Sequence, residues 1–206
     1  MTAPTWTRRL QSGFAQRLAQ LAKDRRGIAA VEFAIIVPLL LAMYFVTLEA
    51  GQGLDTNKKL GRVASIVADL VTQEPAVVKD DLNAILQIGS AILQPYSRSK
   101  PSIYIAGIQL DGANPPTATV KWYRSLINGA TGKVEPSPQP VIPTSLKIPN
   151  TFLVRVYTTL DYKPVIAWSA TDKSGLGFTS PFTGIKMEET YYLRARNGPT
   201  VECSDC

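Results

Sequence analysis

One uninterrupted apolar run dominates the hydrophobic pattern of this chain. It covers residues 28–46, IAAVEFAIIVPLLLAMYFV, and holds a single charged residue, Glu32. As an α-helix with a rise of 1.5 Å per residue, the run would measure about 28 Å, which is close to the hydrocarbon thickness of a bilayer. A buried core helix would keep a polar stripe, which this run lacks. We therefore predict a transmembrane helix, with a secretory signal peptide as the alternative.

Two helical patterns follow the apolar run. We predict a helical stalk over residues 47–73, with an amphipathic stripe that packs either on other subunits or on the chain's own domain. The stripe consists of Leu60, Val63, Ala64, Val67 and Val71. Gly51 and Gly53 predict a break in the stalk. Pro75 suits the first turn of a second amphipathic helix, whose pattern covers residues 76–93.

Beyond Pro95 the hydrophobic period changes from helical to the alternation typical of strands. The predicted strands are residues 103–110, 117–124, 151–161 and 185–196, and the first two form a hairpin. Residues 128–150 carry five prolines and predict a long surface loop. Residues 74–206 therefore form an extracytoplasmic domain of the α+β class, in which helices pack on an antiparallel sheet of about four strands.

The net charge of +6 is concentrated at the N-terminus. Residues 1–27 hold six basic residues and one acidic residue, whereas residues 28–206 hold 16 basic and 15 acidic residues. A nucleic-acid binder would need an excess of Lys and Arg on its folded domain, so we predict no nucleic-acid partner. A basic tail beside an apolar run stays in the cytoplasm, which predicts that residues 47–206 lie outside the cytoplasmic membrane.

The residue types present exclude most catalytic chemistry. Histidine is absent, so Ser-His and Cys-His nucleophiles and His-ligated metals are excluded. Glu188 and Glu189 would point to opposite faces of a strand and cannot act together as acid and base. We predict neither an enzyme nor a cofactor or metal site. Cys203 and Cys206 are interpreted as a structural disulfide that closes a small loop or holds the tail, and a redox-active pair is the alternative.

Two residues inside the apolar run, Glu32 and Pro38, are unusual for a membrane helix and need an explanation. Pro38 removes a helix hydrogen bond and predicts a kink, which membrane helices tolerate. Glu32 places a carboxylate in hydrocarbon, which indicates a function unless the side chain simply reaches the headgroups.

The segment from Arg25 to Phe33, RRGIAAVEF, resembles the processing site of type IV prepilins. Cleavage after Gly27 would make Ile28 the new N-terminus, with Glu32 fifth and Phe33 sixth. A glutamate followed by an aromatic residue there is similar to the tight adherence (Tad/Flp) branch. The stretch from Gly27 to Thr47 also resembles the N-terminal signature of TadE-like (TadE/TadG-like) proteins, the pseudopilins of that system.

This resemblance implies a pilin-like fold and a role as pseudopilin or minor pilin in Tad pilus assembly. The protein would be a single-pass protein of the bacterial inner membrane with a periplasmic C-terminal domain, either retained there or carried into the pilus. The implied partners are the prepilin peptidase, other pilins or pseudopilins and the assembly platform. Glu32 would pair with the α-ammonium group of a neighbouring subunit's Ile28. The alternative function is a membrane-anchored extracytoplasmic binding or sensing domain unrelated to pili.

Overall fold

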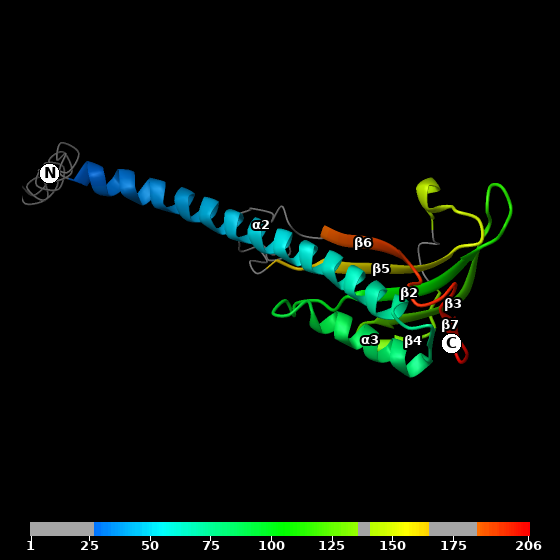
Figure 1. The fold of residues 1–206 in the computed structure, drawn as a ribbon. Coiled ribbons are helices and arrows are strands. Elements are labelled where there is room, and N and C mark those ends of the chain that lie inside the picture. The colour runs from blue at the N-terminus through cyan, green and yellow to red at the C-terminus, as the bar shows by residue number, and fades with distance from the viewer. Residues whose placement is uncertain (1–26, 136–140, 165–184) are drawn as a thin grey trace, which may run out of the picture. The chain divides into compact units, whose positions relative to one another are not determined.

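The computed structural model describes residues 27–135, 141–164 and 185–206 of the chain. The basic leader, apart from Gly27, and a part of the proline-rich loop therefore lie outside the described residues. The chain divides into two compact units, Met1–Leu48 and Glu49–Cys206, and helix α2 (Ile28–Thr72) contributes residues to both. Figure 1 shows the elements of the chain in order.

Helix α2 runs through Gly51 and Gly53 without interruption, so the predicted break is wrong. Each glycine costs a helix about 1 kcal/mol relative to alanine. The C-terminal part of α2 offsets this cost because it buries one face, and the predicted stripe from Leu60 to Val71 is almost fully inaccessible to solvent.

The second unit is built on an antiparallel sheet with the strand order β4-β3-β2-β5-β6. Its strands are β2 (Ser102–Leu110), β3 (Ala118–Ile127), β4 (Ala130–Gly132), β5 (Phe152–Tyr162) and β6 (Ile185–Arg194). The four predicted strands are all present, and β2 and β3 form the predicted hairpin. The α+β class is confirmed, with five strands in this sheet rather than about four.

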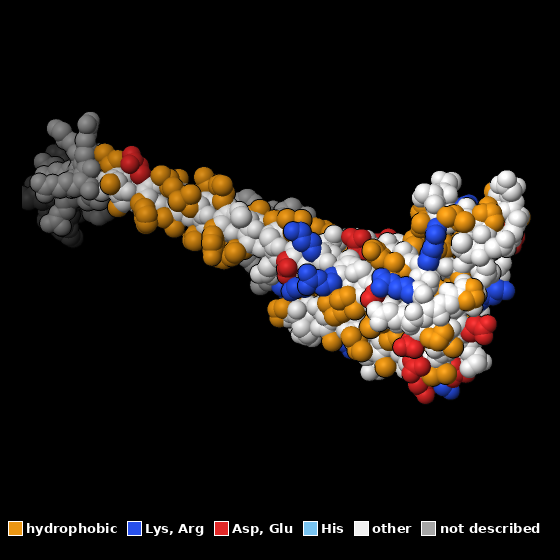
Figure 2. Space-filling view, viewed as in Figure 1, with side chains coloured by type: hydrophobic (Ala, Val, Ile, Leu, Met, Phe, Trp, Pro, Cys, Tyr) orange, Lys and Arg blue, Asp and Glu red, His pale blue; other side chains and the backbone are white. Residues whose placement is uncertain are grey.

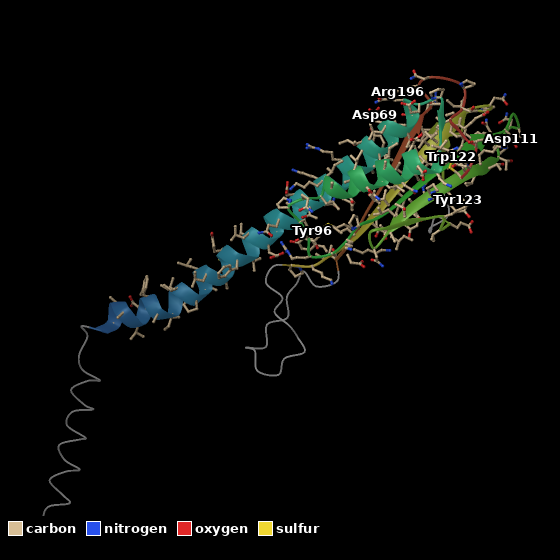
Figure 3. The ribbon with its side chains drawn as sticks, turned by 90° about the horizontal axis from the view of Figure 1, so that it is seen from below. Asp69, Tyr96, Asp111, Trp122, Tyr123 and Arg196 are labelled. Atoms are coloured by element: carbon tan, nitrogen blue, oxygen red, sulfur yellow. A yellow bond between two sulfur atoms is a disulfide. The ribbon has the colours of Figure 1, made fainter. Side chains whose placement is uncertain are left out.

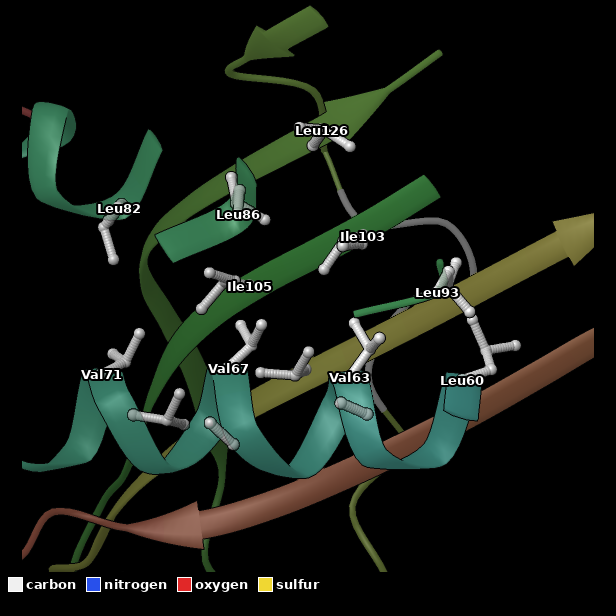
Figure 4. Packing of buried hydrophobic residues seen from close by; sticks show 14 of the residues in the cluster. Leu60, Val63, Val67, Val71, Leu82, Leu86, Leu93, Ile103, Ile105 and Leu126 are labelled. Carbon is white, nitrogen blue, oxygen red and sulfur yellow. The ribbon is translucent and has the colours of Figure 1, made fainter. Parts of the chain in front are cut away.

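Both helices cover the same face of this sheet. In Figure 4, Val63 and Val67 of α2 and Leu86 of α3 (Lys79–Ala91) surround Ile103 and Ile105 of β2. All five side chains have zero exposure. The amphipathic stripe of α2 therefore packs on the chain's own domain, which decides between the two predicted alternatives.

Helix α3 begins three residues later than the pattern predicted. Ala76 and Val77 instead form strand β1, which pairs in parallel with β7 (Glu202–Cys203). This pairing joins residues more than 120 positions apart in the sequence, so the local helical period gave no sign of it.

The opposite face of the sheet carries a smaller core under the proline-rich segment. Ala106, Ile108 and Leu153 are buried there against Ile142, close to the short helix η2 (Thr144–Leu146). Strand β4 also falls within residues 128–150, so the prediction of one continuous loop is wrong over Ala130–Gly132. Asn128 and Gly129 have positive φ angles of 54° and 86° and form the tight turn that brings β4 back onto β3.

Candidate functional site

The first unit exposes a long apolar helical surface. Among the described residues, α2 is the one helix long and apolar enough to cross a membrane, with a mean hydropathy of 2.3 in its most apolar window. None of that window is buried. Phe33 is 69% exposed and Leu39 is 64% exposed. On the face shown in Figure 2, hydrophobic side chains predominate along this part of α2. Such a surface is typical of a helix that crosses a membrane and indicates a single-pass anchor.

Glu32 lies on this surface as an exposed side chain. It forms no hydrogen bond or ion pair with any residue in the described part of the chain. Ile28 and Glu32 are four residues apart, so they share one helix face and lie about 6 Å apart along the axis. The carboxylate of Glu32 is therefore presented outward, one turn beyond the first residue of the helix.

Gly27 immediately precedes helix α2 and lies in open space. A Cβ atom built on Gly27 would meet no other atom within 4 Å. Substitution at this position therefore tests recognition by other proteins rather than packing against the described residues. Pro38 lies inside α2, which continues on both sides of it. Its lack of an N–H leaves the carbonyl of Ala34 without the usual helix partner.

A buried polar cluster, which the sequence did not predict, lies at the start of the second unit. The side chain of Glu49 in α2 is only 5% exposed. The hydroxyl of Tyr162 donates a hydrogen bond of 2.5 Å to Glu49 Oε1, and Arg98 Nη1 lies 3.9 Å from the same oxygen. Arg98 also donates to Gln52 Oε1 at 2.9 Å and to the carbonyl of Lys163 at 2.9 Å. This cluster ties one turn of α2 to the end of β5.

Aromatic stacking completes this polar cluster. The rings of Tyr96 and Tyr162 stack with their centroids 5.7 Å apart, and Arg98 lies over the ring of Tyr96. Burial and, to a smaller extent, the carboxylate of Glu49 raise the pKa of Tyr162 to about 12. The phenol therefore stays a hydrogen-bond donor throughout the physiological pH range. In the sequence, the one sign of this cluster is that Glu49 lies three residues beyond the end of the apolar run.

The predicted cysteines lie in the second unit, where a disulfide joins Cys203 and Cys206. Within the described ranges, Cys203, Asp205 and Cys206 form the one group of metal-ligating side chains whose ligand atoms lie within 4.8 Å of one another. Because the disulfide uses both sulfur atoms, this form of the protein offers a metal only the carboxylate of Asp205. No combination of nucleophile and base occurs among these residues.

Comparison with known proteins finds one similarity, in the N-terminal part of the chain. The family model described as TadE-like protein matches residues 27–69, a segment that contains Gly27, Glu32 and Pro38. No curated protein and no solved structure matches the chain. TadE-like proteins are generally non-enzymatic structural proteins, and the match supports a role associated with the Tad pilus. Residues 27–69 are therefore similar to TadE-like proteins, in agreement with the resemblance drawn from the sequence.

Proposed function

We propose that the chain is a membrane-anchored pseudopilin or minor pilin that acts in Tad pilus assembly. Residues 28–46 cross the bacterial inner membrane, residues 1–27 lie in the cytoplasm and residues 47–206 lie in the periplasm. The observation that carries this proposal is the exposed apolar helix with an outward-facing Glu32, inside the segment that matches TadE-like proteins. The six basic residues of the leader support the orientation.

The prepilin peptidase removes the leader by cutting between Gly27 and Ile28. Glycine suits this position because a peptidase must accommodate an extended backbone immediately before the helix begins, and a side chain would hinder that approach. The cut creates a positively charged α-amino group on Ile28, one helical turn from Glu32.

Glu32 then acts between subunits. An ionised side chain at the centre of a membrane helix costs about 2.5–3.5 kcal/mol on insertion scales, and less near the edge, where Glu32 lies. The α-ammonium group of another subunit's Ile28 offsets this cost if the two charges pair in the apolar environment. The pair would fix the register of neighbouring helices, with Phe33 packing beside it. The partners of this protein are therefore other pilins or pseudopilins, held by the assembly platform.

Replacing Glu32 with glutamine separates insertion from assembly. Glu32→Gln keeps the shape and removes the charge, so we expect normal membrane levels and normal cleavage after Gly27. We expect at least about a tenfold loss of surface pili or of co-purified pilus components, since a charge pair worth about 1.4 kcal/mol changes an equilibrium tenfold. Protease treatment of spheroplasts measures insertion, and electron microscopy and affinity purification measure assembly.

Glu74→Gln is the matched control, because Glu74 is exposed and lies outside the apolar run. It should leave both insertion and piliation unchanged. Wild-type piliation in Glu32→Gln would show that the carboxylate merely reaches the headgroups. Wild-type piliation after complete deletion of the gene would favour the alternative, an anchored binding or sensing domain unrelated to pili.

A further inference from the structure

The C-terminal segment, residues 196–206, fastens several elements of the second unit together, and we call it the clasp. It begins at the C-terminal end of α2. The backbone N–H of Arg196 donates to the carbonyl of Thr72 at 3.0 Å, and the Arg196 guanidinium lies 2.7 Å from Asp69 Oδ1. Figure 3 shows Arg196 and Asp69 close together at this end of the helix.

The middle of the clasp is part of the core. Val201 is 1% exposed, and its carbonyl accepts a hydrogen bond of 2.8 Å from the indole Nε1 of Trp122 in β3. The next two residues form β7 and pair with β1. The clasp therefore joins α2, β1 and β3 before it reaches its cysteines.

The end of the clasp caps helix α3. The residue before this helix is Val78, which has no side-chain acceptor for the unpaired N–H groups of the first turn. Asp205 supplies the acceptor from 126 residues away, because its Oδ1 accepts from the backbone N–H of Lys79 at 2.7 Å. A carboxylate at this position also interacts favourably with the helix dipole.

The residue that caps α3 lies within the disulfide loop. Asp205 lies inside the loop closed by Cys203 and Cys206, and the carbonyl of Cys206 accepts a hydrogen bond from Lys133 Nζ. Closing the loop removes backbone conformations in which Asp205 points away from α3. With free thiols the same four residues would gain that freedom, and the cap would be occupied for a smaller fraction of the time.

We propose that Cys203 and Cys206 are the substrate site of an extracytoplasmic thiol–disulfide oxidoreductase, and that their oxidation locks Asp205 onto the N-terminus of α3. The two thiols lose two protons and two electrons as the S–S bond forms. The disulfide of the oxidoreductase takes up the two electrons and the two protons and becomes a dithiol. The inference rests on the proposed function in one respect, that residues 47–206 lie outside the cytoplasm. The domain would thus complete its fold only after export.

Hydrogen exchange on the full-length protein in detergent micelles tests the locking step. Reduction of the disulfide should speed exchange at the Lys79 amide about five- to tenfold, the change expected for loss of a helix N-cap. Asp205→Ala removes the acceptor and should produce at least this acceleration in the oxidised protein, with no further acceleration on reduction. Ser204→Ala is the control, because Ser204 lies in the same loop and is exposed. Amides in the central strands β2 and β5 should be unaffected.

Two results would overturn the locking step. One is a Lys79 amide that exchanges equally fast before and after reduction. The other is an acceleration of all amides together, which would mean that the disulfide stabilises the unit without a specific effect on the cap.

Thiol alkylation in intact cells tests the oxidation step. Cells that contain a periplasmic dithiol oxidase should yield protein that does not react until it is reduced, and cells without the oxidase should yield two reactive thiols. Free thiols in both strains would overturn the oxidation step. Neither measurement depends on pili, so a failure of the pilus proposal in the Glu32→Gln experiment leaves both results interpretable.

Discussion

Removing the hydroxyl of Tyr162 tests the polar cluster at the start of the second unit. In Tyr162→Phe the ring can still stack on Tyr96, whereas the 2.5 Å hydrogen bond to Glu49 is lost. Tyr162 is 2% exposed and Glu49 is 5% exposed, so water cannot readily replace the missing donor. A hydrogen bond to a charged group contributes about 1.5–3 kcal/mol, and we expect a loss of that size in the free energy of unfolding.

The pH dependence of this loss provides a second signature. The folded-state pKa of Tyr162, about 12, lies above its ordinary value of 10.0. A group whose pKa is raised by folding contributes fully to the free energy of unfolding when the pH lies below its unfolded-state pKa. For Tyr162 this contribution disappears as the pH rises from about 10 to 12. The stability difference between wild type and Tyr162→Phe should therefore shrink by up to about 1.4 kcal/mol per pH unit in that window.

Denaturant unfolding of the full chain in detergent micelles, followed by tryptophan fluorescence between pH 8 and 11.5, measures both effects. Tyr191→Phe is the matched control, because Tyr191 lies in edge strand β6 and is 42% exposed. Its stability should change by less than about 0.5 kcal/mol. A Tyr162→Phe variant as stable as this control, or a stability difference that stays constant up to pH 11.5, would refute the reasoning.

Two further predictions concern packing and a turn. In Gly89→Ala the new Cβ would lie 2.7 Å from Val67 Cγ2, and this overlap should outweigh the gain in helix propensity and lower stability by about 1–2 kcal/mol. In Gly61→Ala the new Cβ would meet the Glu189 side chain at an ordinary 3.8 Å, so this variant should be neutral or stabilising. Thermal unfolding of the two variants measures the difference, and equal stability of both would contradict the packing. Hydrogen bonds from the backbone N–H groups of Thr117 and Ala113 hold the pKa of Asp111 below its usual 3.8. These hydrogen bonds therefore stabilise the fold above that pH, and their contribution to the free energy of unfolding is lost as the pH falls below it. Unfolding midpoints at pH 5 and pH 3 should show that Asp111→Asn loses less stability on acidification than wild type, and an equal loss in both would refute this role.

The sequence predicted the elements whose hydrophobic period is local. The stripe on α2 follows from one buried face, and the nearly continuous apolar run of β5 follows from burial on both faces of the sheet. The break predicted at Gly51 and Gly53 was wrong because glycine propensity is a weaker effect than the burial of one face of α2 between Thr56 and Thr72. Strand β4 did have a signal, since Asn128-Gly129 is a favoured two-residue hairpin turn.

The missed features depend on contacts between distant segments. Neither the pairing of β1 with β7 nor the Asp205 cap on α3 has a local pattern, because each joins residues more than 120 positions apart. Arg98 and Glu49 are separated by 49 positions and become partners only when β5 ends beside α2. The features of the first unit, in contrast, could be predicted because they are local. Gly27, Glu32 and Pro38 are recognisable from their spacing in and beside the apolar run, and the family match covers the same segment.

The N-terminus of the mature protein tests the central claim most directly. Membrane-extracted protein from cells that contain the prepilin peptidase should begin at Ile28, as read by N-terminal sequencing and intact mass. Gly27→Leu should retain the leader, whereas Gly51→Leu should still be cut, because a Cβ at either glycine meets nothing within 4 Å and only the first lies at the proposed cleavage site. Wild-type protein that keeps residues 1–27 in those cells would contradict the account.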